Sequence, residues 1–420
     1  MSHSKKNIPK RRFKKFSNIE SWEQLELGEV IEDQYNGQTP SRANDAFWKG
    51  NINWLSSGEL NKGIVTKTME KITEAGQDNA RLKIIPKGTF VLAITGLEAA
   101  GTRGNCGILG IDTALNQSCM ALFPNKKKLA APFLFQWYLK IGEEYGIRYT
   151  QGTKQQSYNA ALIKILPIAL PSMGEQVVIA EFLDRLDNTI ALHQRKLEKI
   201  KALKTAYLSE MFPAEGETKP KRRFAGFTDD WEQRKLGEIA NSFEYGLNAS
   251  SKTYDGENKY IRITDIDESS HVFNQDNLTS PNISLDKLNH YLLEEGDILL
   301  ARTGASTGKS YYYSKMDGKV FFAGFLIRAK IKQEYNVSFI FQNTLTERYN
   351  NFIQVTSQRS GQPGINAQEY ARFALYIPEL KEQQKIGVFF KQLDNAIALH
   401  QRKLQKLQNI KKAYLNEMFI

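Results

Sequence analysis

Two long segments of this chain are nearly identical, and this internal repeat constrains the fold more than any other feature. Residues 175–212 and 382–419 lie 207 positions apart and share 23 of 38 residues. The run Ile-Ala-Leu-His-Gln-Arg-Lys-Leu is common to both copies. A period of this length is far too long for a solenoid. The chain is therefore expected to consist of two halves that end in the same element.

Weaker markers open each half, and between the markers and the repeated segments the halves differ greatly. One feature that both variable regions share is an apolar run that ends in Thr-Gly, at residues 87–96 and 295–304. The order is variable region, repeated segment, variable region, repeated segment. The opening markers are Pro-Lys-Arg-Arg-Phe at 9–13 and 220–224, and Trp-Glu-Gln at 22–24 and 231–233, each of the latter followed by Leu-Gly-Glu.

The repeated segments have the heptad pattern of coiled-coil helices. Apolar positions recur at spacings of three and four over more than four heptads, without proline and with Gly387 as the one interior glycine. A 38-residue helix is about 57 Å long, and such a rod needs a partner for its apolar stripe. The matching partner is the other copy. The predicted seam consists of Ile179, Leu186, Ile190, His193, Leu197, Leu393, Ile397, His400 and Leu404.

Polar residues on these helices have structural explanations. His193 and His400 lie on the seam, and no carboxylate or cysteine stands nearby at ligand spacing, so we expect a neutral hydrogen-bonded layer rather than a metal or catalytic site. The basic residues on the outer faces fit either a solvated surface or a docking surface for another subunit or for phosphates. These are Arg195, Lys196, Lys199, Lys201, Arg402, Lys403 and Lys406.

The variable regions have the composition of α+β domains with polar loops. Short strand-like runs such as 90–94, 260–263, 298–301 and 320–328 alternate with Gly-, Asn- and Ser-rich loops, and each region ends in a helix-like stretch, 132–145 or 337–353, before its last strand. The expected organisation is a basic tail (1–17), a first variable domain (18–165), the central helix (166–214), a linker (215–224), a second variable domain (225–375) and the C-terminal helix (376–420).

The net charge of +11 suggests a polyanionic partner. Seven of the positive charges lie in the first fifteen residues, and such a tail is commonly a solvated arm. In the loops, Arg and Gln are suited to base edges, and Lys and Ser to phosphates. The candidate contacts are Thr39, Ser41, Arg103, Lys154, Gln155, Gln156, Tyr158, Arg302, Thr303, Ser306, Lys309, Gln358, Arg359 and Gln362.

Several motifs of catalysis fail on inspection. Residues 304–310 read GASTGKS, one residue short of a phosphate-binding loop, and an extended segment is expected to follow instead of a helix. The Glu257–Lys259 pair resembles a nuclease motif only by three residues in a loop. No dinucleotide-binding glycine pattern is present, and no nucleophile elbow. The two cysteines, Cys106 and Cys119, lack zinc-site spacing, and their small number is typical of a reducing cytoplasm.

Taken as a whole, the chain resembles the specificity subunits of type I restriction-modification systems. The resemblance covers essentially the full length and rests on residues 174–197, their copy at 381–404, and the region openings WEQLELGEV and WEQRKLGEI. Residues 37–41 (GQTPS), 48–54 (WKGNINW) and 360–366 (SGQPGIN) are similar to segments of target-recognition domains. The first region departs from the last of these, with QGTKQQSYN at 151–159, so the two domains are expected to read different sequences.

This resemblance implies two globular target-recognition domains, joined and spaced by two long antiparallel coiled-coil helices with pseudo-two-fold symmetry. Each domain would read one half of a bipartite double-stranded DNA target. The helices would set the spacer and dock two modification (methyltransferase) subunits and, through them, restriction (translocase-nuclease) subunits. The chain itself would be non-catalytic and bind no cofactor or metal, while S-adenosylmethionine, ATP and Mg would belong to the partners. The alternatives are a stand-alone nuclease or methyltransferase, and a scaffold that uses its helices only for oligomerisation.

Overall fold

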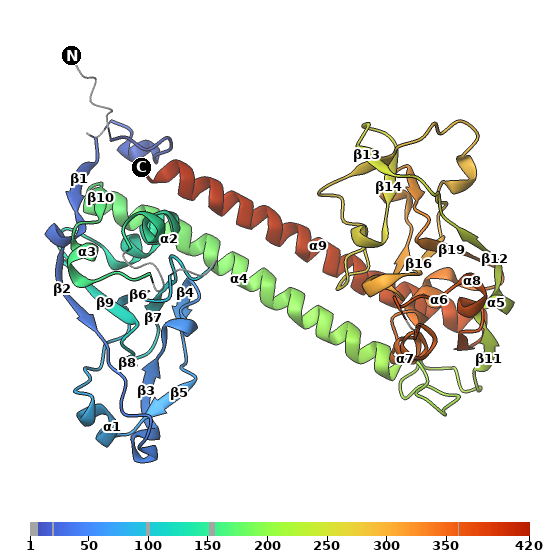
Figure 1. Ribbon diagram of the computed structural model, residues 1–420, viewed down its shortest axis with the longest axis horizontal. Coiled ribbons are helices and arrows are strands. Elements are labelled where there is room, and N and C mark those ends of the chain that lie inside the picture. The colour runs from blue at the N-terminus through green and yellow to red at the C-terminus, as the bar shows by residue number, and fades with distance from the viewer. Residues whose placement is uncertain (1–6, 19–20, 98–100, 151–155, 360) are drawn as a thin grey trace. The chain divides into compact units, whose positions relative to one another are not determined.

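The computed structural model describes residues 7–18, 21–97, 101–150, 156–359 and 361–420. It divides into two compact units, residues 1–192 with 404–420 and residues 193–403. Each unit contains one α+β domain and parts of both long helices (Figure 1). None of the helices in the described ranges has an apolar stretch long enough to cross a bilayer.

The first unit is built around a five-stranded sheet of order β2-β9-β6-β7-β4, with a three-stranded sheet β5-β3-β8 and the pair β1-β10 beside it. Its helices are α1 (Glu74–Asn79), α2 (Ala131–Arg148), α3 (Ala160–Lys164) and the start of α4 (Met173–Glu210). Its strands are β1 (Glu23–Glu26), β2 (Ile31–Asn36), β3 (Trp48–Leu55), β4 (Gly63–Val65), β5 (Glu70–Ile72), β6 (Phe90–Ala93), β7 (Cys106–Leu109), β8 (Ala114–Leu115), β9 (Cys119–Pro124) and β10 (Pro167–Leu170).

The second unit has a four-stranded sheet of order β12-β19-β16-β17 and the pairs β11-β20, β13-β15 and β14-β18. Its helices are α5 (Leu236–Ile239), α6 (Val337–Asn343), α7 (Glu347–Thr356), α8 (Ala367–Tyr370) and most of α9 (Leu380–Met418). Its strands are β11 (Glu232–Lys235), β12 (Ala240–Tyr245), β13 (Ser251–Thr253), β14 (Lys259–Ile261), β15 (Thr279–Pro281), β16 (Ile298–Ala301), β17 (Ser310–Tyr312), β18 (Val320–Phe322), β19 (Leu326–Ile331) and β20 (Ala374–Ile377).

Each domain has its own hydrophobic core, in which a fully apolar central strand packs against a helix. All four residues of β6 are buried, and α2 covers β6 and β7 with Phe133, Trp137 and Tyr138. In the second domain β16 is buried along its whole length, and Phe339 of α6 lies in the same core as Ile298. Side chains buried on both faces of a strand explain why these two runs are continuously apolar rather than alternating.

Two details differ from the sequence expectation. The expected helix 337–353 is two helices, because Thr344 donates its hydroxyl to the Phe341 carbonyl at 2.7 Å and Thr346 caps α7. Such local side-chain bonds compete with helix continuation. The closing strands β10 and β20 pair with the opening strands β1 and β11, whereas the expected boundaries at 165 and 375 leave out the first strand and cut the second.

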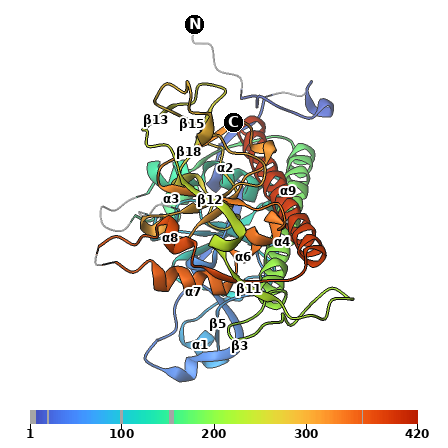
Figure 2. The ribbon, with the colours of Figure 1, turned by 90° about the vertical axis from the view of Figure 1, so that its right-hand side faces the viewer.

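Within each unit, the parts of the long helices α4 and α9 lie side by side (Figures 1 and 2). In the first unit, Phe182 meets Tyr414 at 4.8 Å between ring centroids and Asp187 pairs with Lys411. In the second unit, Lys204 pairs with Asp394 at 2.6 Å, and Tyr207 meets Phe389 at 4.9 Å. As the number on α4 rises, the number on α9 falls. The pairing is therefore antiparallel within each unit. The aromatic pair and the ion pair of the first unit recur in the second unit with the helices exchanged.

The predicted seam residues face the helix pair to different extents. Ile179, Leu197 and Ile397 are buried. The others are half-buried, namely Leu186, Ile190, His193, Leu393, His400 and Leu404. Within the second unit, Nδ1 of His193 lies 3.0 Å from Nδ1 of His400. A bond between two ring nitrogens needs one donor and one acceptor, so at least one ring is neutral.

This histidine pair predicts a pH-dependent stability. Burial, the neighbouring His193, and Lys196 and Lys403 lower the pKa of His400. The folded state therefore prefers the neutral ring, and this contribution is lost as the pH falls through the unfolded value of about 6.5. The melting temperature of the protein should fall between about pH 8 and about pH 5.5, and by less in a His193→Asn/His400→Asn variant. Equal falls in both proteins would show that the pair does not contribute.

Candidate nucleic-acid interface

Two loops far apart in the sequence meet at the surface of the second domain. Residues 302–309 follow β16, and residues 357–359 and 361–366 follow α7; we call them the second loop cluster. The backbone N–H of Gly304 donates to the Pro363 carbonyl at 2.9 Å, and that of Ile365 donates to the Arg302 carbonyl at 2.9 Å. The cluster brings together all the candidate contacts of this half, Arg302, Thr303, Ser306, Lys309, Gln358, Arg359 and Gln362.

Arg302 is stacked on an aromatic ring within this cluster. Its guanidinium carbon lies 4.8 Å from the ring centroid of Tyr245, which is 43% exposed. Phe325, 59% exposed, accepts a backbone hydrogen bond from Arg302 at 3.0 Å. Exposed aromatic rings beside an arginine plane are surfaces on which bases stack. Tyr245 and Phe325 were not among the sequence candidates, because no local pattern marks them.

Arg359 is anchored but accessible. Its Nη2 donates to Oε1 of Glu369 at 2.6 Å, and its Nη1 donates to the carbonyls of Thr356 and Gln358. Burial would raise the pKa of Glu369, but the N–H of Asn366 and the guanidinium lower it below its usual range. The carboxylate therefore stays ionised at neutral pH and orients the arginine, whose side chain remains 42% exposed.

Lys309 is more enclosed than its position in a glycine-rich turn suggests. Its side chain is 21% exposed, and its Nζ lies 3.6 Å from Oε2 of Glu268, which is itself 86% exposed. An ion pair of that length on the surface contributes little to stability. The segment continues directly into strand β17, as expected for a loop that is not a phosphate-binding loop.

The first domain closes its loop in the same way. Thr95 bridges to Ser157 as Thr303 bridges to Gly364, so both domains tie the loop after their central strand to the segment before their last helix. Arg103 donates to Oε1 of Gln156 at 3.2 Å. Lys154 and Gln155 lie outside the described residues.

Tyr158 was wrongly included among the candidate contacts. It is 3% exposed and belongs to the core of the first domain, and burial raises the pKa of its hydroxyl. Its place in the loop corresponds to Ile365 of the second domain, which is also buried. The polar composition of the surrounding loop gave no indication that this aromatic side chain is buried.

Thr39 lines a polar pocket that the sequence alone did not indicate, whereas Ser41 is not among the lining residues. Thr39 donates to the side chain of Gln117, and the Ser41 carbonyl accepts from the Trp48 indole at 3.1 Å. The pocket, of about 480 Å³, is open to solvent and lined by Tyr35, Asn36, Gln38, Thr39, Asn79, Ala80 and Arg81. Amide and guanidinium groups converge there from β2 and from the end of α1. Asn, Gln and Arg are the side chains that bond base edges in pairs of hydrogen bonds.

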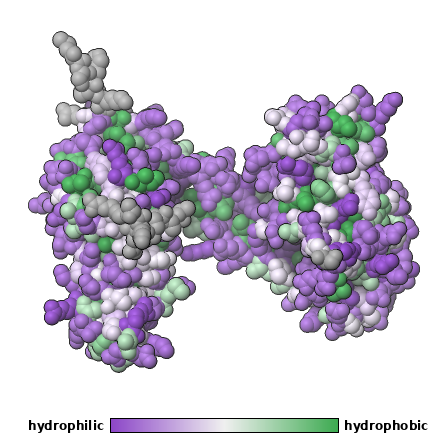
Figure 3. Space-filling view, viewed as in Figure 1, coloured by the Kyte–Doolittle hydropathy of each residue, from purple (hydrophilic) through white to green (hydrophobic). Residues whose placement is uncertain are grey.

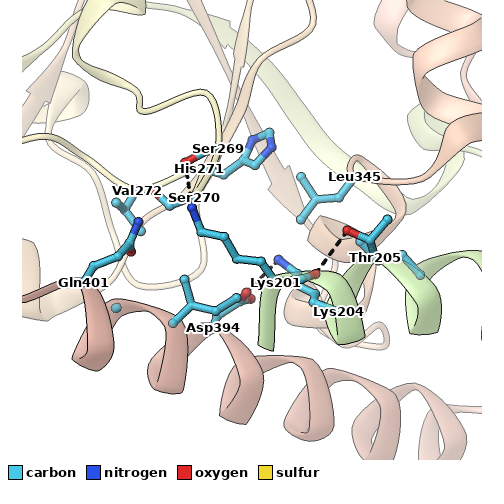
Figure 4. A pocket seen from close by; sticks show the side chains of 13 residues that line it. Lys201, Lys204, Thr205, Ser269, Ser270, His271, Val272, Leu345, Asp394 and Gln401 are labelled. Carbon is cyan, nitrogen blue, oxygen red and sulfur yellow. Dashed lines mark hydrogen bonds and ion pairs between the residues drawn. The ribbon is translucent and has the colours of Figure 1, made fainter. Parts of the chain in front are cut away.

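A second pocket, shown in Figure 4, lies where the second domain meets its helices. It has a volume of about 280 Å³, and the loop 269–272 faces α4 and α9 across it. Lys201 donates to the Ser269 hydroxyl at 3.2 Å, and Lys204 pairs with Asp394. The Lys201 contact attaches the domain to α4, and the Lys204–Asp394 pair joins α4 to α9, so Lys201 is engaged in the fold rather than being part of a solvated face.

The described residues contain no cluster of three or more metal-ligating side chains. Both cysteines are buried as thiols, and burial raises the pKa of Cys106 to about 12, which keeps it protonated and weakly nucleophilic. Figure 3 shows mostly hydrophilic side chains on the visible face of each unit, with small hydrophobic patches. The exposed chemistry is thus that of hydrogen bonding and stacking.

Comparison with known proteins assigns this arrangement to a family. Residues 19–202 and 228–409 each match the type I restriction modification DNA specificity domain. The chain belongs to the family of type I restriction-modification specificity subunits, with one target-recognition domain in each half. Within such systems the specificity subunit is the DNA-recognition component, is not itself catalytic, and assembles with other subunits.

Individual relatives are distant but extend over the chain. The MjaVIII specificity subunit of Methanocaldococcus jannaschii is 23% identical over 406 residues, which cover 94% of this chain and 92% of that protein. The EcoKI specificity subunit of Escherichia coli is 24% identical over 270 residues, 59% of this chain and 57% of that protein. The crystal structure of the S subunit from M. genitalium matches with a TM-score of 0.69 at 17% identity, covering 98% of this chain and 99% of that one.

Proposed function

We propose that each domain reads one half of a bipartite duplex DNA target through its paired loops. The observation that carries this proposal is the shared closure, Thr95 with Ser157 and Thr303 with Gly364, which presents different side chains on the same frame. In the second domain the readers are Arg302, Arg359 and Gln362, with Tyr245 as a stacking surface. In the first they are Arg103 and Gln156, together with the amide-lined pocket around Gln38.

We further propose that the α4–α9 pair sets the spacer between the half-sites and docks two modification subunits, which in turn bring the restriction subunits. The exposed basic residues that recur on both helices, such as Lys196 with Lys403, support an assembly in which two identical partners bind equivalent surfaces. S-adenosylmethionine, ATP and Mg would then be bound by those partners. Two protonated, buried thiols suit a protein that works in the cytoplasm, where host DNA is available.

The loop assignment is tested by comparing Arg359→Ala with Lys309→Ala in the assembled methyltransferase. If Arg359 reads a guanine edge, its loss should cost about 1–3 kcal/mol and relax the preference at one position of the second half-site. Loss of Lys309 as a phosphate contact should weaken binding to all sequences alike and reduce the salt slope by about one. Binding is measured on cognate and single-base variant duplexes at several salt concentrations.

Lys315→Ala is the matched control, because it removes one exposed positive charge from the second domain outside the second loop cluster and outside both long helices. Equal, sequence-independent losses from Arg359→Ala and Lys309→Ala would reject Arg359 as a base reader. No loss from either variant would remove the second loop cluster from the interface.

A further inference from the structure

The repeated Arg-Arg-Phe segments at residues 11–13 and 222–224 have no part in the function described so far, yet both make a dense set of contacts. Each lies just before a target-recognition domain in the sequence, and each touches α4 and α9 within its own unit. We call residues 11–13 the first clasp and residues 222–224 the second clasp. The first clasp lies in the basic N-terminal tail, for which the charge suggests a solvated arm. The contacts show that residues 11–13 are instead packed against the helices.

The second arginine of the first clasp forms a buried ion pair with the start of α4. Nε of Arg12 donates to Oε1 of Glu175 at 2.8 Å, and Nη2 donates to Oε2 at 2.5 Å. The side chains are 6% and 0% exposed. A two-pronged bond of this kind fixes both distance and orientation, so the clasp holds the first turn of α4 in one place.

Of the other two residues of the first clasp, Arg11 contacts α9 and Phe13 packs against α4. Arg11 donates from its backbone N–H to the Glu417 carbonyl at 2.8 Å and from Nε to the Glu417 carboxylate, and its guanidinium covers the Tyr414 ring at 5.1 Å. Phe13 packs edge-on against Phe182 of α4 at 5.7 Å, and Phe182 packs against Tyr414. One short segment therefore binds the beginning of α4 and the end of α9 together.

The second clasp repeats these contacts with the helices exchanged. Arg223 makes the same two-pronged bond to Glu382 at the start of α9, at 2.9 and 2.6 Å, with the carboxylate fully buried. Arg222 binds the backbone and side chain of Glu210 at the end of α4 and covers Tyr207 at 5.5 Å. Phe224 packs against Phe389, which meets Tyr207.

We infer that the two clasps fix the register of α4 against α9 and thereby set the spacer length that the protein accepts, an inference that rests on the proposed function. A heptad seam alone is degenerate, because sliding one helix by seven residues, about 10 Å, restores its pattern. On DNA such a slip corresponds to about three base pairs at about 3.4 Å each. A clasp that holds residues of both helices forbids the slip. Arg12 and Arg223 are thus positioning residues for the spacer.

The test uses the full complex with its modification subunits and a series of duplexes in which the two half-sites are separated by spacers that differ by one base pair. Arg12→Ala removes the two-pronged bond, and Arg12→Lys keeps the charge but not the fork. Lys10→Ala is the control, since it removes an exposed charge from the same segment. Arg12→Ala should lower the preference for the native spacer about tenfold or more, Arg12→Lys less, and Lys10→Ala not at all.

A second readout follows the helices without DNA. Spin labels on cysteines introduced at Glu181 and Lys412, both exposed and both in the first unit, report the α4–α9 distance by electron paramagnetic resonance. The native cysteines are buried, so the spin label should react with the introduced cysteines and not with them. Arg12→Ala should broaden this distance distribution, and Lys10→Ala should not.

The two readouts separate the possible failures. If Arg12→Ala broadened the α4–α9 distance but even the unaltered complex did not recognise a bipartite site, the result would count against the proposed function and still support the clasp. Unchanged distance and unchanged spacer preference in folded Arg12→Ala or Arg12→Lys would overturn the inference. A lower melting temperature with both readouts unchanged would also overturn it, because the clasp would then be a stabilising contact only.

Discussion

Replacing residues 225–378 with the same region of another family member should change one half of the recognised DNA sequence and leave the other half unchanged. The exchanged segment carries the whole second loop cluster and both strands of the β11-β20 pair. The first domain has its own core and its own loop closure, so its readers keep their positions. Binding to the original site should fall by at least about 10³-fold, the lower end of the difference between specific and non-specific DNA binding.

Methylation mapping of DNA modified by the assembled enzyme reads out both halves of the site at once. An exchange limited to residues 225–375 is an informative control, because it ends inside β20. The hybrid β20 would then begin with residues of the donor protein and end with residues of this chain. We expect the longer exchange to fold better. A change in both halves of the site, or in neither, would contradict the division of the target between the domains.

Gly37→Ala should strongly destabilise the first domain. Gly37 follows β2, and its φ is not positive, so backbone conformation does not require glycine there. The lack of space does, because a β-carbon would collide with the carbonyls of Leu115 and Asn116. Because backbone cannot move aside as a flexible side chain does, we expect a loss of about 3 kcal/mol in the free energy of unfolding, the upper part of the range for overpacking. Gly246 follows β12 in the second domain and faces the carbonyl of Ala323 in the same way.

Gly174→Ala is the matched control, since nothing lies within 4 Å of a β-carbon at that position in the first turn of α4. It should be neutral or stabilising by up to about 1 kcal/mol through helix propensity. Thermal and urea unfolding of the three proteins would show the contrast. If Gly37→Ala and Gly174→Ala melted alike, the close approach at Gly37 would not be required for the fold.

Periodic and repeated features could be read from the sequence. The 207-residue repeat and the heptad spacing indicated the two long helices, and the bounds of α4 and α9 differ from the repeated segments by only one or two residues. Continuously apolar runs marked β6 and β16. Hydrophobic spacing can be read from the sequence because it reflects the local geometry of helices and strands. A repeat can be read because it is found by comparing the sequence with itself, whatever the fold.

Residue contacts between distant segments depended on the tertiary structure. The sequence alone indicated the polar loops and the Arg-Arg-Phe repeats. It did not indicate that residues 302–309 meet residues 357–359 and 361–366, nor that Tyr158 is buried while Tyr245 is exposed. Arg12 reads as one more charge of a basic tail until Glu175, 163 positions away, is placed against it. Charge and composition describe what a side chain can do, whereas burial and partners come from chain segments that only the folded backbone brings together, because packing is specified by surfaces distant in sequence.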